Sequence, residues 1–419
     1  MAEKSFTWQN STAGIKPFST RATSGYDPMI PRKTVSRCAR SIVASMNLKP
    51  GDNTVVQGGV HCQDLLEDVA YECYRAGAIP MIMSRSDGQS LRVMRDISPS
   101  TLERVPQHLL GAYKGMDCII RIETLEDPAV ASKYPRDSIE AHTKSSVPLR
   151  EVLMGEKTGR GKKWCYAGWP TEKAAKYFGI DYKMYERFII DGMIFPIRNL
   201  RKRCERIEEL LRGATRLNIT DPEGTDMVVE IGGRRINLDD GFVSDEDVSI
   251  NDIGNNLPAG EVFIAPLENR GSGSIFCPIT KDRFTGSIIR ELELTFNKGV
   301  LDLGSVRASE NGDAVVKSFK AAMKIDQQTR KTQRTLNIAE LGIGCNPKVT
   351  QSIGYILTDE KVVGSVHVAF GNNFSYGGTS KSSMHWDFVT VPSATMVAEL
   401  EDGGERTVMK NGKLARSRA

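Results

Sequence analysis

The stretch LKPGDNTVVQGGVHCQDLLEDVAYECYRAGAIPMIM, residues 48–83, decides the fold class of the first half of the chain. A Pro-Gly-Asp turn precedes a short apolar strand at 54–57, and residues 64–76 then carry apolar side chains at helical spacing. Gly77 closes this helix, and residues 78–83 follow as a buried strand. A strand, a helix and a strand joined by short turns predict a parallel sheet.

The same pattern extends on both sides of this stretch. A helix is expected at 35–46, and residues 116–122 repeat the buried-strand pattern after further helical sequence. The Gly58-Gly59 pair resembles part of a dinucleotide-binding loop, but the full GxGxxG fingerprint is absent. We therefore expect a Rossmann-like parallel sheet without a nucleotide site at this position.

The second half of the chain changes character. Residues 184–212 are mostly helical with a break at Pro196, after which short alternating strands continue to the end. A turn is expected at 221–224, a hairpin of 227–231 with 235–238, and a helix near 315–332. These patterns predict a β-rich α+β fold for the second half.

These patterns divide the chain into four parts. The expected boundaries are an N-terminal arm at 1–30, an α/β domain with a bridging helix at 31–215, a C-terminal domain at 216–410 and a polar tail at 411–419.

Composition limits the classes of function. The 419 residues are 40% hydrophobic and 26% charged, as in ordinary soluble proteins, and a net charge of +4 is too small to indicate nucleic acid as a partner. The eight cysteines stand singly with no CxxC pair, which fits a reducing compartment. No apolar run is long enough for a membrane span, and the polar start MAEKSFTWQN lacks a signal-peptide core. We therefore expect a cytoplasmic protein with no membrane partner.

Two adjacent C-terminal stretches carry candidate metal ligands. In residues 384–388, His385 and Asp387 are two apart, so on a strand both side chains point to one face while the apolar neighbours point to the other. In residues 365–370 the same alternation separates His367 from its apolar neighbours. Imidazole with carboxylate is a usual ligand set for zinc, manganese or iron. The alternative is a core histidine paired with a buried aspartate.

Two glutamates stand in similarly apolar surroundings. Glu261 enters the strand 261–264, and a carboxylate buried there needs a partner. Glu340 is followed on its own face of a strand by Gly342 and Gly344, which suggests room for a metal or ligand; the alternative is that these glycines mark bends. With the two histidines and Asp387, these glutamates make five potential ligands, enough for two metals about 3.5–4 Å apart.

Four segments, 256–266, 338–347, 365–371 and 384–388, resemble in order and separation the metal-binding blocks of the thermophilic-type metallo-aminopeptidases, the family of aminopeptidase T and aminopeptidase S. The resemblance extends more weakly over most of the chain. It implies a two-domain α/β protein, usually a homodimer. It also implies a dinuclear site in the C-terminal domain, with these ligands: Glu261, Glu340, His367, His385 and Asp387.

One departure from that family concerns the reaction. The family carries a functional Tyr at the position of Phe374, and Tyr376, which points the same way on a strand, is the expected substitute. A second resemblance, to the iron-dependent 2,5-dihydroxypyridine dioxygenases, lies in 342–347 and in His385-x-Asp387. Those enzymes have His in place of Glu340 and lack the counterpart of His367. The retained set of ligands therefore favours hydrolysis over oxygen chemistry.

The expected function is a metal-dependent hydrolase that resembles a metallo-aminopeptidase. It would use one or two divalent ions (Zn, Co, Mn or Fe) per subunit to activate water for attack on an amide or related carbonyl of a short peptide or small molecule. Glu340 is the expected base, Glu261 or Asp387 the expected bridge, and Tyr376 a further catalytic residue. A homo-oligomer, dimer or larger, is expected.

Two alternatives remain open. One is a mononuclear Fe(II) dioxygenase that cleaves the ring of a hydroxylated N-heteroaromatic such as 2,5-dihydroxypyridine. The other is a non-catalytic binding or assembly protein that kept the fold.

Overall fold

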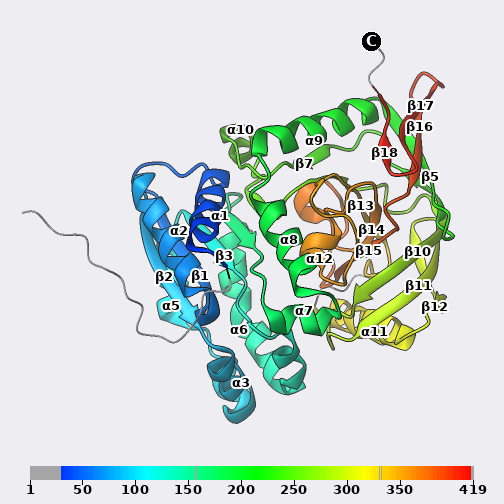
Figure 1. The fold of residues 1–419 in the computed structure, drawn as a ribbon. Coiled ribbons are helices and arrows are strands. Elements are labelled where there is room, and N and C mark those ends of the chain that lie inside the picture. The colour runs from blue at the N-terminus through cyan, green and yellow to red at the C-terminus, as the bar shows by residue number, and fades with distance from the viewer. Residues whose placement is uncertain (1–29, 156–157, 330, 332, 417–419) are drawn as a thin grey trace, which may run out of the picture.

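The computed structural model describes residues 30–155, 158–329, 331 and 333–416. The expected N-terminal arm therefore lies outside the described residues, except for the buried Ile30. The first part of the fold is a five-stranded parallel sheet in the order β2-β1-β3-β4-β8 (Figure 1). Its strands are β1 (Asn53–Gly59), β2 (Ile79–Arg85), β3 (Cys118–Ile122), β4 (Lys163–Ala167) and β8 (Gly254–Leu257).

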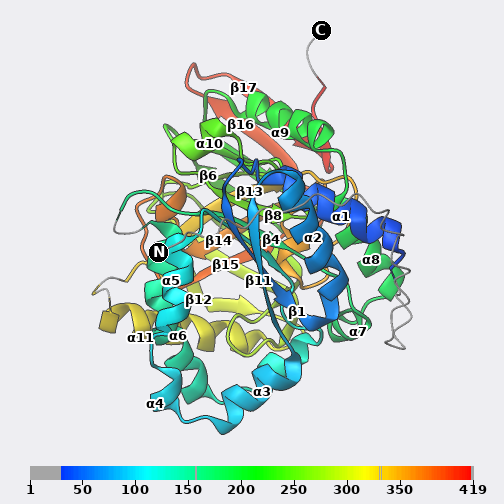
Figure 2. The ribbon, with the colours of Figure 1, turned by 90° about the vertical axis from the view of Figure 1, so that its left-hand side faces the viewer.

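Helices cover both faces of this sheet. Figure 2 shows α1 and α2 on one side and α5 and α6 on the other. The helices of this part are α1 (Arg32–Ser45), α2 (Gln63–Arg75), α3 (Asp87–Asp96), α4 (Pro99–Leu102), α5 (Gln107–Gly115), α6 (Arg136–Met154), α7 (Glu172–Phe178), α8 (Tyr182–Met193), α9 (Ile197–Leu211) and α10 (Asp245–Ser249), with 3₁₀ turns η1 (Val60–Cys62) and η2 (Pro128–Lys133). The helices expected at 35–46 and 64–76 are confirmed, as is the break at Pro196 between α8 and α9.

The strand predicted at 78–83 exists as β2, but the prediction that it is buried is wrong. It lies at the edge of the sheet and pairs only with β1. Ile79 is 56% exposed and Met81 45% exposed. An apolar run marks a strand equally well in the centre and at the edge, so its sequence does not reveal which neighbours the strand has.

The second part consists of two antiparallel sheets. An eight-stranded sheet has the order β12-β11-β10-β6-β5-β16-β17-β18, and a five-stranded sheet the order β15-β14-β13-β9-β7. Their strands are β5 (Ala214–Thr220), β6 (Asp226–Glu230), β7 (Ile236–Asp239), β9 (Glu261–Ile264), β10 (Ser272–Lys281), β11 (Ile288–Asn297), β12 (Val300–Arg307), β13 (Ile338–Gly344), β14 (Val366–Gly371), β15 (His385–Val389), β16 (Thr395–Leu400), β17 (Glu405–Lys410) and β18 (Lys413–Leu414). Helices α11 (Gly312–Thr329) and α12 (Ile356–Asp359) and the 3₁₀ turn η3 (Phe374–Tyr376) complete it.

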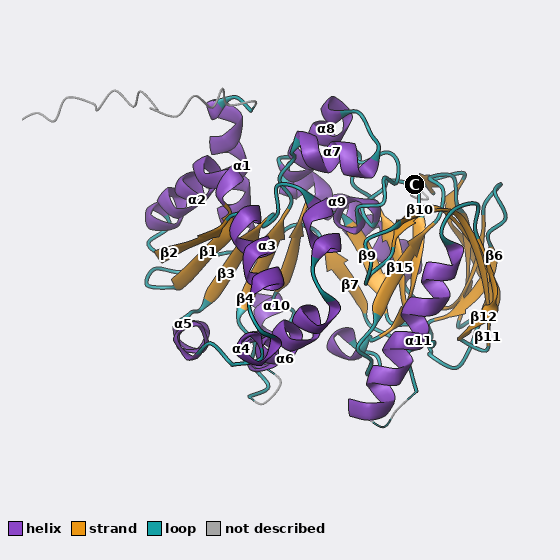
Figure 3. Ribbon diagram, turned by 90° about the horizontal axis from the view of Figure 1, so that it is seen from below, coloured by secondary structure: helices purple, strands orange, loops and turns teal. Residues whose placement is uncertain are grey.

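The two antiparallel sheets pack face to face, beside the parallel sheet (Figure 3). Phe296 of β11 meets Phe370 of β14 with ring centroids 5.9 Å apart, and the indole of Trp386 donates to Thr280 Oγ1 at 3.3 Å. Phe319 of α11 stacks on Trp386 at 5.5 Å. The apolar side chains that alternate with the candidate ligands therefore face this core, as their spacing predicts.

The predicted hairpin of 227–231 with 235–238 is wrong. Strand β6 pairs with β5 and β10, whereas β7 pairs with β9 in the other sheet. The β5–β6 hairpin turns instead at Asp221, whose carboxylate accepts from the amides of Glu223 at 2.8 Å and Thr225 at 3.2 Å. The Gly232-Gly233 pair thus carries the chain from one sheet to the other.

Two further segments join sheets that the sequence did not assign to them. Residues 254–257 lie beyond the expected domain boundary, yet they form β8 and pair in parallel with β4. Lys413–Leu414 in the expected tail form β18, which pairs with β17. Among the described helices, none combines the length and the apolar character that a membrane span needs.

Candidate metal centre

The five-stranded antiparallel sheet gathers the predicted ligands on one face. Gly342 of β13 lies opposite His367 of β14, and Ala369 pairs with Glu340 on one side and Asp387 on the other. Residues directly opposite, or two apart on one strand, share a face of a sheet. The register thus places all of the predicted ligands on this face: Glu261, Glu340, His367, His385 and Asp387.

These side chains form two groups of three that share Glu340. We call Glu261, Glu340 and His367 the inner triplet, and Glu340, His385 and Asp387 the outer triplet; within each, potential ligand atoms lie within 4.8 Å of one another. His367 Nε2 is 3.2 Å from Glu261 Oε2 and 3.3 Å from Glu340 Oε1. His385 Nε2 is 3.2 Å from Asp387 Oδ1 and 3.7 Å from Glu340 Oε2. The two oxygens of Glu340 therefore face different histidines.

The two glycines after Glu340 do not leave open space, so that prediction is wrong. A Cβ on Gly342 would lie 2.0 Å from His367 Nε2, and one on Gly344 would lie 2.1 Å from the carbonyl oxygen of Val362. The imidazole of His367 therefore lies over Gly342. A side chain there would displace the ring from the two glutamates.

A buried lysine that the sequence analysis missed contacts the inner triplet. The ammonium of Lys361, 0% exposed, donates to Glu261 Oε1 and lies 3.0 Å from Asp239 Oδ2 and 3.3 Å from Glu360 Oε2. Burial alone would lower the pKa of Lys361, but these carboxylates raise it well above its usual range. Lys361 is therefore a fixed positive charge beside Glu261.

The histidines hold protons in the metal-free protein. Burial alone would lower the pKa of His385, but the carboxylates of Asp387 and Glu340 outweigh burial and raise it to about 10. The pKa of His367 is likewise raised well above its usual range, against burial, by Glu261 and Glu340. A metal ion binds neutral imidazole and must displace these protons.

The outer histidine is oriented by its other ring nitrogen. His385 Nδ1 lies 2.8 Å from the carbonyl oxygen of Asn372, to which it donates, so its Nε2 faces the carboxylates. The Tyr376 hydroxyl lies 3.4 Å from the same Nδ1 and donates to the Asn372 carbonyl at 3.2 Å. His367 Nδ1 has no acceptor within the described part of the chain.

Tyr376 and Phe374 occupy different environments. The prediction that they point the same way along a strand is wrong, because they lie in η3, a single 3₁₀ turn. Phe374 is 54% exposed, with the ammonium of Lys381 3.8 Å from its ring centroid. Tyr376 packs edge-on against Phe263 at 5.5 Å and His385 at 6.1 Å. Tyr376 therefore lies beside the outer triplet, and Phe374 lies outside it.

The donor set fits a divalent ion. Glu261 Oε2 and Asp387 Oδ1 are buried and, within the residues described, accept no hydrogen bond of normal geometry. Each of these oxygens has a histidine Nε2 at 3.2 Å, so a divalent ion bound between the oxygen and the nitrogen would take the place of the proton that the histidine holds in the metal-free protein. Carboxylate oxygen and imidazole nitrogen are together the ligands of zinc, manganese and iron sites.

Sequence reasoning missed Asp239, Glu360 and Lys361. Asp-Glu-Lys at 359–361 reads as an ordinary charged turn, and its burial depends on contacts with β7 and β9, more than ninety residues earlier. The signal that was present is the apolar sequence after it, Val362-Val363-Gly364. A charged triplet that runs into apolar residues can mark a buried ion cluster.

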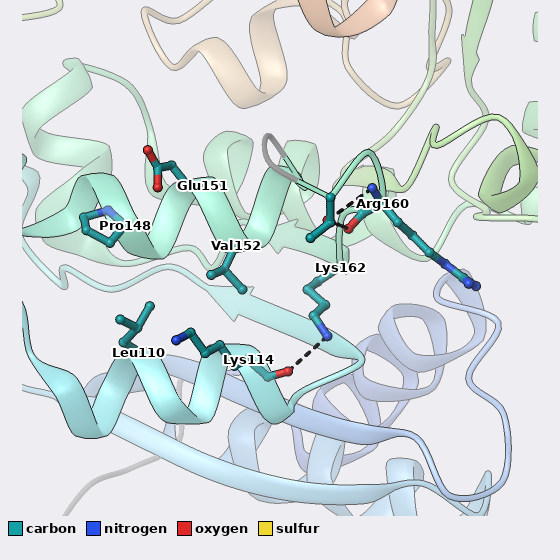
Figure 4. A pocket seen from close by; sticks show the side chains of 8 residues that line it. Leu110, Lys114, Pro148, Glu151, Val152, Arg160 and Lys162 are labelled. Carbon is teal, nitrogen blue, oxygen red and sulfur yellow. Dashed lines mark hydrogen bonds between the residues drawn. The ribbon is translucent and has the colours of Figure 1, made fainter.

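A separate hollow of about 480 Å³ lies between α5 and α6 (Figure 4). It is lined by Leu110, Lys114, Val152, Lys162 and neighbouring residues, and no member of either triplet lines it. The candidate metal centre is therefore a buried cluster of ligands rather than this surface hollow.

Comparisons with known proteins agree with this geometry. The family model described as thermophilic metalloprotease (M29) matches residues 32–414, a range that holds both triplets. Among solved structures, AmpT from Thermus thermophilus matches with a TM-score of 0.73 at 16% identity, over 92% of this chain and 100% of that chain. The 2,5-dihydroxypyridine dioxygenase from Pseudomonas putida KT2440 matches with a TM-score of 0.57 at 12% identity, over 93% and 99%. At these identities the structural likeness concerns the fold. No curated protein gives a significant sequence match.

Proposed function

Because this chain belongs to the thermophilic metalloprotease (M29) family and is a metal-dependent hydrolase, we propose that it is an aminopeptidase with a dinuclear centre formed by the two triplets. The observation that carries the proposal is Glu340, whose two carboxylate oxygens face the inner and the outer histidine. A carboxylate placed in this way is the natural bridge between two ions.

The charge of the cluster supports two ions rather than one. Among the residues that the structure describes, Lys361 is the one lysine in contact with it, whereas five carboxylates gather there: Asp239, Glu261, Glu340, Glu360 and Asp387. In the metal-free protein burial raises the pKa of Asp239 to about 7 and that of Glu360 well above its usual range, so bound cations would have to ionise both. With all five then ionised and both histidines neutral, four negative charges remain, which two divalent cations would balance. One divalent cation would leave a buried net charge, which is unfavourable.

The bound ions would supply Lewis acidity, which lowers the pKa of a coordinated water toward ~7 and polarises the carbonyl that is attacked. From its sequence context, Glu340 was expected to be the base that accepts the proton of the water. The geometry favours the bridging role for Glu340, since neither of its oxygens is free of a histidine. We assign the base to Glu360 instead, because it lies outside both triplets and its Oε2 is 3.3 Å from the Lys361 ammonium that binds Glu261. Burial, with the charges of Glu261 and Asp387 adding to it, raises the pKa of Glu360 well above its usual range.

Tyr376, two residues further along η3, would take the catalytic role of the tyrosine that the family carries at position 374. Burial raises the pKa of its hydroxyl well above the usual range, and the Glu340 carboxylate adds to the shift, so the phenol stays protonated. A protonated phenol beside the outer triplet can donate to the oxygen that gains charge when the carbonyl is attacked.

The substrate approaches at the outer triplet. The His385 side chain is 29% exposed, whereas the His367 side chain is 0% exposed. The free amine of a peptide N-terminus is positively charged and fits the outer triplet, which has two carboxylates and one histidine. We further expect the homo-oligomer and the cytoplasmic location that the sequence analysis predicted.

The ring-cleaving dioxygenase is the second candidate, since one such enzyme shares the fold. A mononuclear Fe(II) oxygenase site typically holds iron with two histidines and one carboxylate. Each triplet here has one histidine and two carboxylates. The donor set therefore favours hydrolysis.

One experiment separates these functions. Metal-free protein is loaded with Co²⁺, Mn²⁺ or Zn²⁺ and assayed on short peptides with a free N-terminus and on the same peptides N-acetylated. The proposal predicts hydrolysis of the free peptides only. Oxygen uptake with Fe²⁺ and 2,5-dihydroxypyridine, without peptide hydrolysis, would establish the dioxygenase instead.

A further inference from the structure

A glutamate at the end of the central strand β3 of the parallel sheet accepts hydrogen bonds from two tyrosines. Glu123 directly follows β3; its amide donates to the carbonyl of Ala167 at 3.0 Å, and its carbonyl accepts from the amide of Gly59 at 3.0 Å. Its Oε2 accepts from the hydroxyl of Tyr166 at 3.0 Å and from that of Tyr355 at 2.7 Å. Burial raises the pKa of both tyrosines well above the usual range, with Glu123 adding to it, so both remain donors.

Tyr355 belongs to a rigid turn, residues 353–361, which we call the linking segment. The Asp359 carboxylate accepts from the amides of Ile353 and Gly354, each at 2.8 Å. The Tyr355 carbonyl accepts from the amides of Thr358 at 2.9 Å and Asp359 at 3.0 Å. These bonds close the turn on itself, so a displacement at Tyr355 moves the whole linking segment.

The far end of the linking segment supplies Lys361. Its amide donates to the carbonyl of Thr358 at 2.9 Å, and its carbonyl accepts from the amide of Asn346 at 3.1 Å. Its ammonium binds Glu261 of the inner triplet and Asp239 of β7. A continuous chain of hydrogen bonds therefore runs from the parallel sheet to one member of the inner triplet. Within the described residues, neither Tyr355 nor Lys361 forms a hydrogen bond or ion pair with Asp387 or His385.

We infer that Glu123 and Tyr355 are positioning residues for the inner triplet: they set where Lys361 lies and, through it, how Glu261 presents its oxygen to an ion. The parallel sheet, which contributes no ligand, thereby tunes the affinity of one of the two sites. The inference rests on the proposed dinuclear centre. Partners one step removed from metal ligands commonly alter affinity by about 10–100-fold.

The chain offers a matched control. Tyr166 and Tyr355 donate to the same oxygen of Glu123, but Tyr166 lies on β4 and outside the linking segment. Tyr166→Phe and Tyr355→Phe each remove one buried hydroxyl that bonds to Glu123. Only the second loosens the linking segment.

The experiment measures Mn²⁺ binding by isothermal titration calorimetry in two backgrounds. Asp387→Asn disables the outer triplet and His367→Gln disables the inner one. In the Asp387→Asn background we expect Tyr355→Phe to weaken Mn²⁺ binding about tenfold and Tyr166→Phe to change it less than twofold. In the His367→Gln background neither should change it more than twofold. Glu123→Gln should act in the direction of Tyr355→Phe, and thermal unfolding of each variant controls for loss of fold.

The outcomes separate the inference from the function on which it rests. Equal effects of the two tyrosine variants, or an effect of Tyr355→Phe on the outer triplet alone, would overturn the positioning role. If a background variant does not fold, the two tyrosine variants are compared in the otherwise wild-type protein. There Tyr355→Phe should weaken one of the two Mn²⁺ binding events and leave the other unchanged, and a shift of both events would overturn the positioning role. Failure of the wild-type protein to bind Mn²⁺ would overturn the dinuclear centre itself, and the inference with it.

Discussion

The inner and outer triplets share Glu340 and differ in their surroundings. The inner histidine, His367, is fully buried, and its partner Glu261 is fixed by the ammonium of Lys361. The outer histidine, His385, is 29% exposed at its side chain and is fixed by the Asn372 carbonyl, with Tyr376 beside it. The inner triplet is thus buried and held by a lysine, whereas the outer triplet is partly exposed to solvent.

This difference indicates a division of roles. An ion in the inner triplet would exchange slowly and hold the bridge in place, because its ligands are buried and one of them is tied to a lysine. An ion in the outer triplet would meet the substrate. Substitutions in the two triplets and beside them can break that division, above all at the residue that the two triplets share.

The largest effect is expected at Glu340. Glu340→Gln replaces one of the two ligand oxygens with an NH2 group and removes the negative charge that both triplets share, so the bridge is lost, both ions should bind more weakly and turnover should fall by about 10³ or more. Metal content by mass spectrometry, measured with the peptide assay, checks this. If the variant kept its full metal content but lost turnover, Glu340 would be the general base rather than the bridging ligand.

A smaller loss is expected at Glu360. Glu360→Gln keeps the shape of the side chain and both triplets, so the protein should retain two ions while kcat falls about 10²-fold, as for a lost general base. The pH profile of kcat should also lose its acidic limb. Unchanged kcat would show that another group takes the proton.

Metal affinity should depend on pH through the histidines. The pKa of His385 in the metal-free protein is about 10, so between neutral pH and that value an ion must displace one proton from the outer triplet. The outer affinity for Mn²⁺ should therefore rise about tenfold per pH unit and level off near pH 10. Titration calorimetry of the His367→Gln variant in buffers of different ionisation enthalpy counts the released protons, and a count of zero would contradict the assignment.

The smallest effects separate the two aromatic residues of η3. Tyr376→Phe should lower kcat about tenfold with little change in KM, because a donor to the transition state is lost. Phe374→Tyr should change kcat less than twofold, since the ring is 54% exposed and outside the outer triplet. The reverse ranking of the two variants would place the catalytic phenol at position 374.

Local patterns predicted the elements of the first half well. Helical spacing and a closing glycine were enough for α2, and the apolar run was enough for β1. Pairing between distant segments was not predictable in the same way. β8 is the four residues Gly-Asn-Asn-Leu, without an apolar run, and it becomes a strand because β4 offers an edge.

The site shows the same limit. Period-two alternation correctly placed His385 and Asp387 on one face of their strand and His367 on the face opposite its apolar neighbours, because alternation is a local property of a strand. Lys361 could not be found in this way. Its partners, Asp239 and Glu261, lie on two other strands, and only the assembled sheet shows that a lysine in a charged turn is buried among them.

Anomalous scattering from crystals grown with Mn²⁺ tests the central claim most directly. The account predicts two peaks about 3.5–4 Å apart, one among Glu261, Glu340 and His367 and the other among Glu340, His385 and Asp387, with Glu340 between them. A single peak bound by both histidines, or no peak on this face of the sheet, would contradict it.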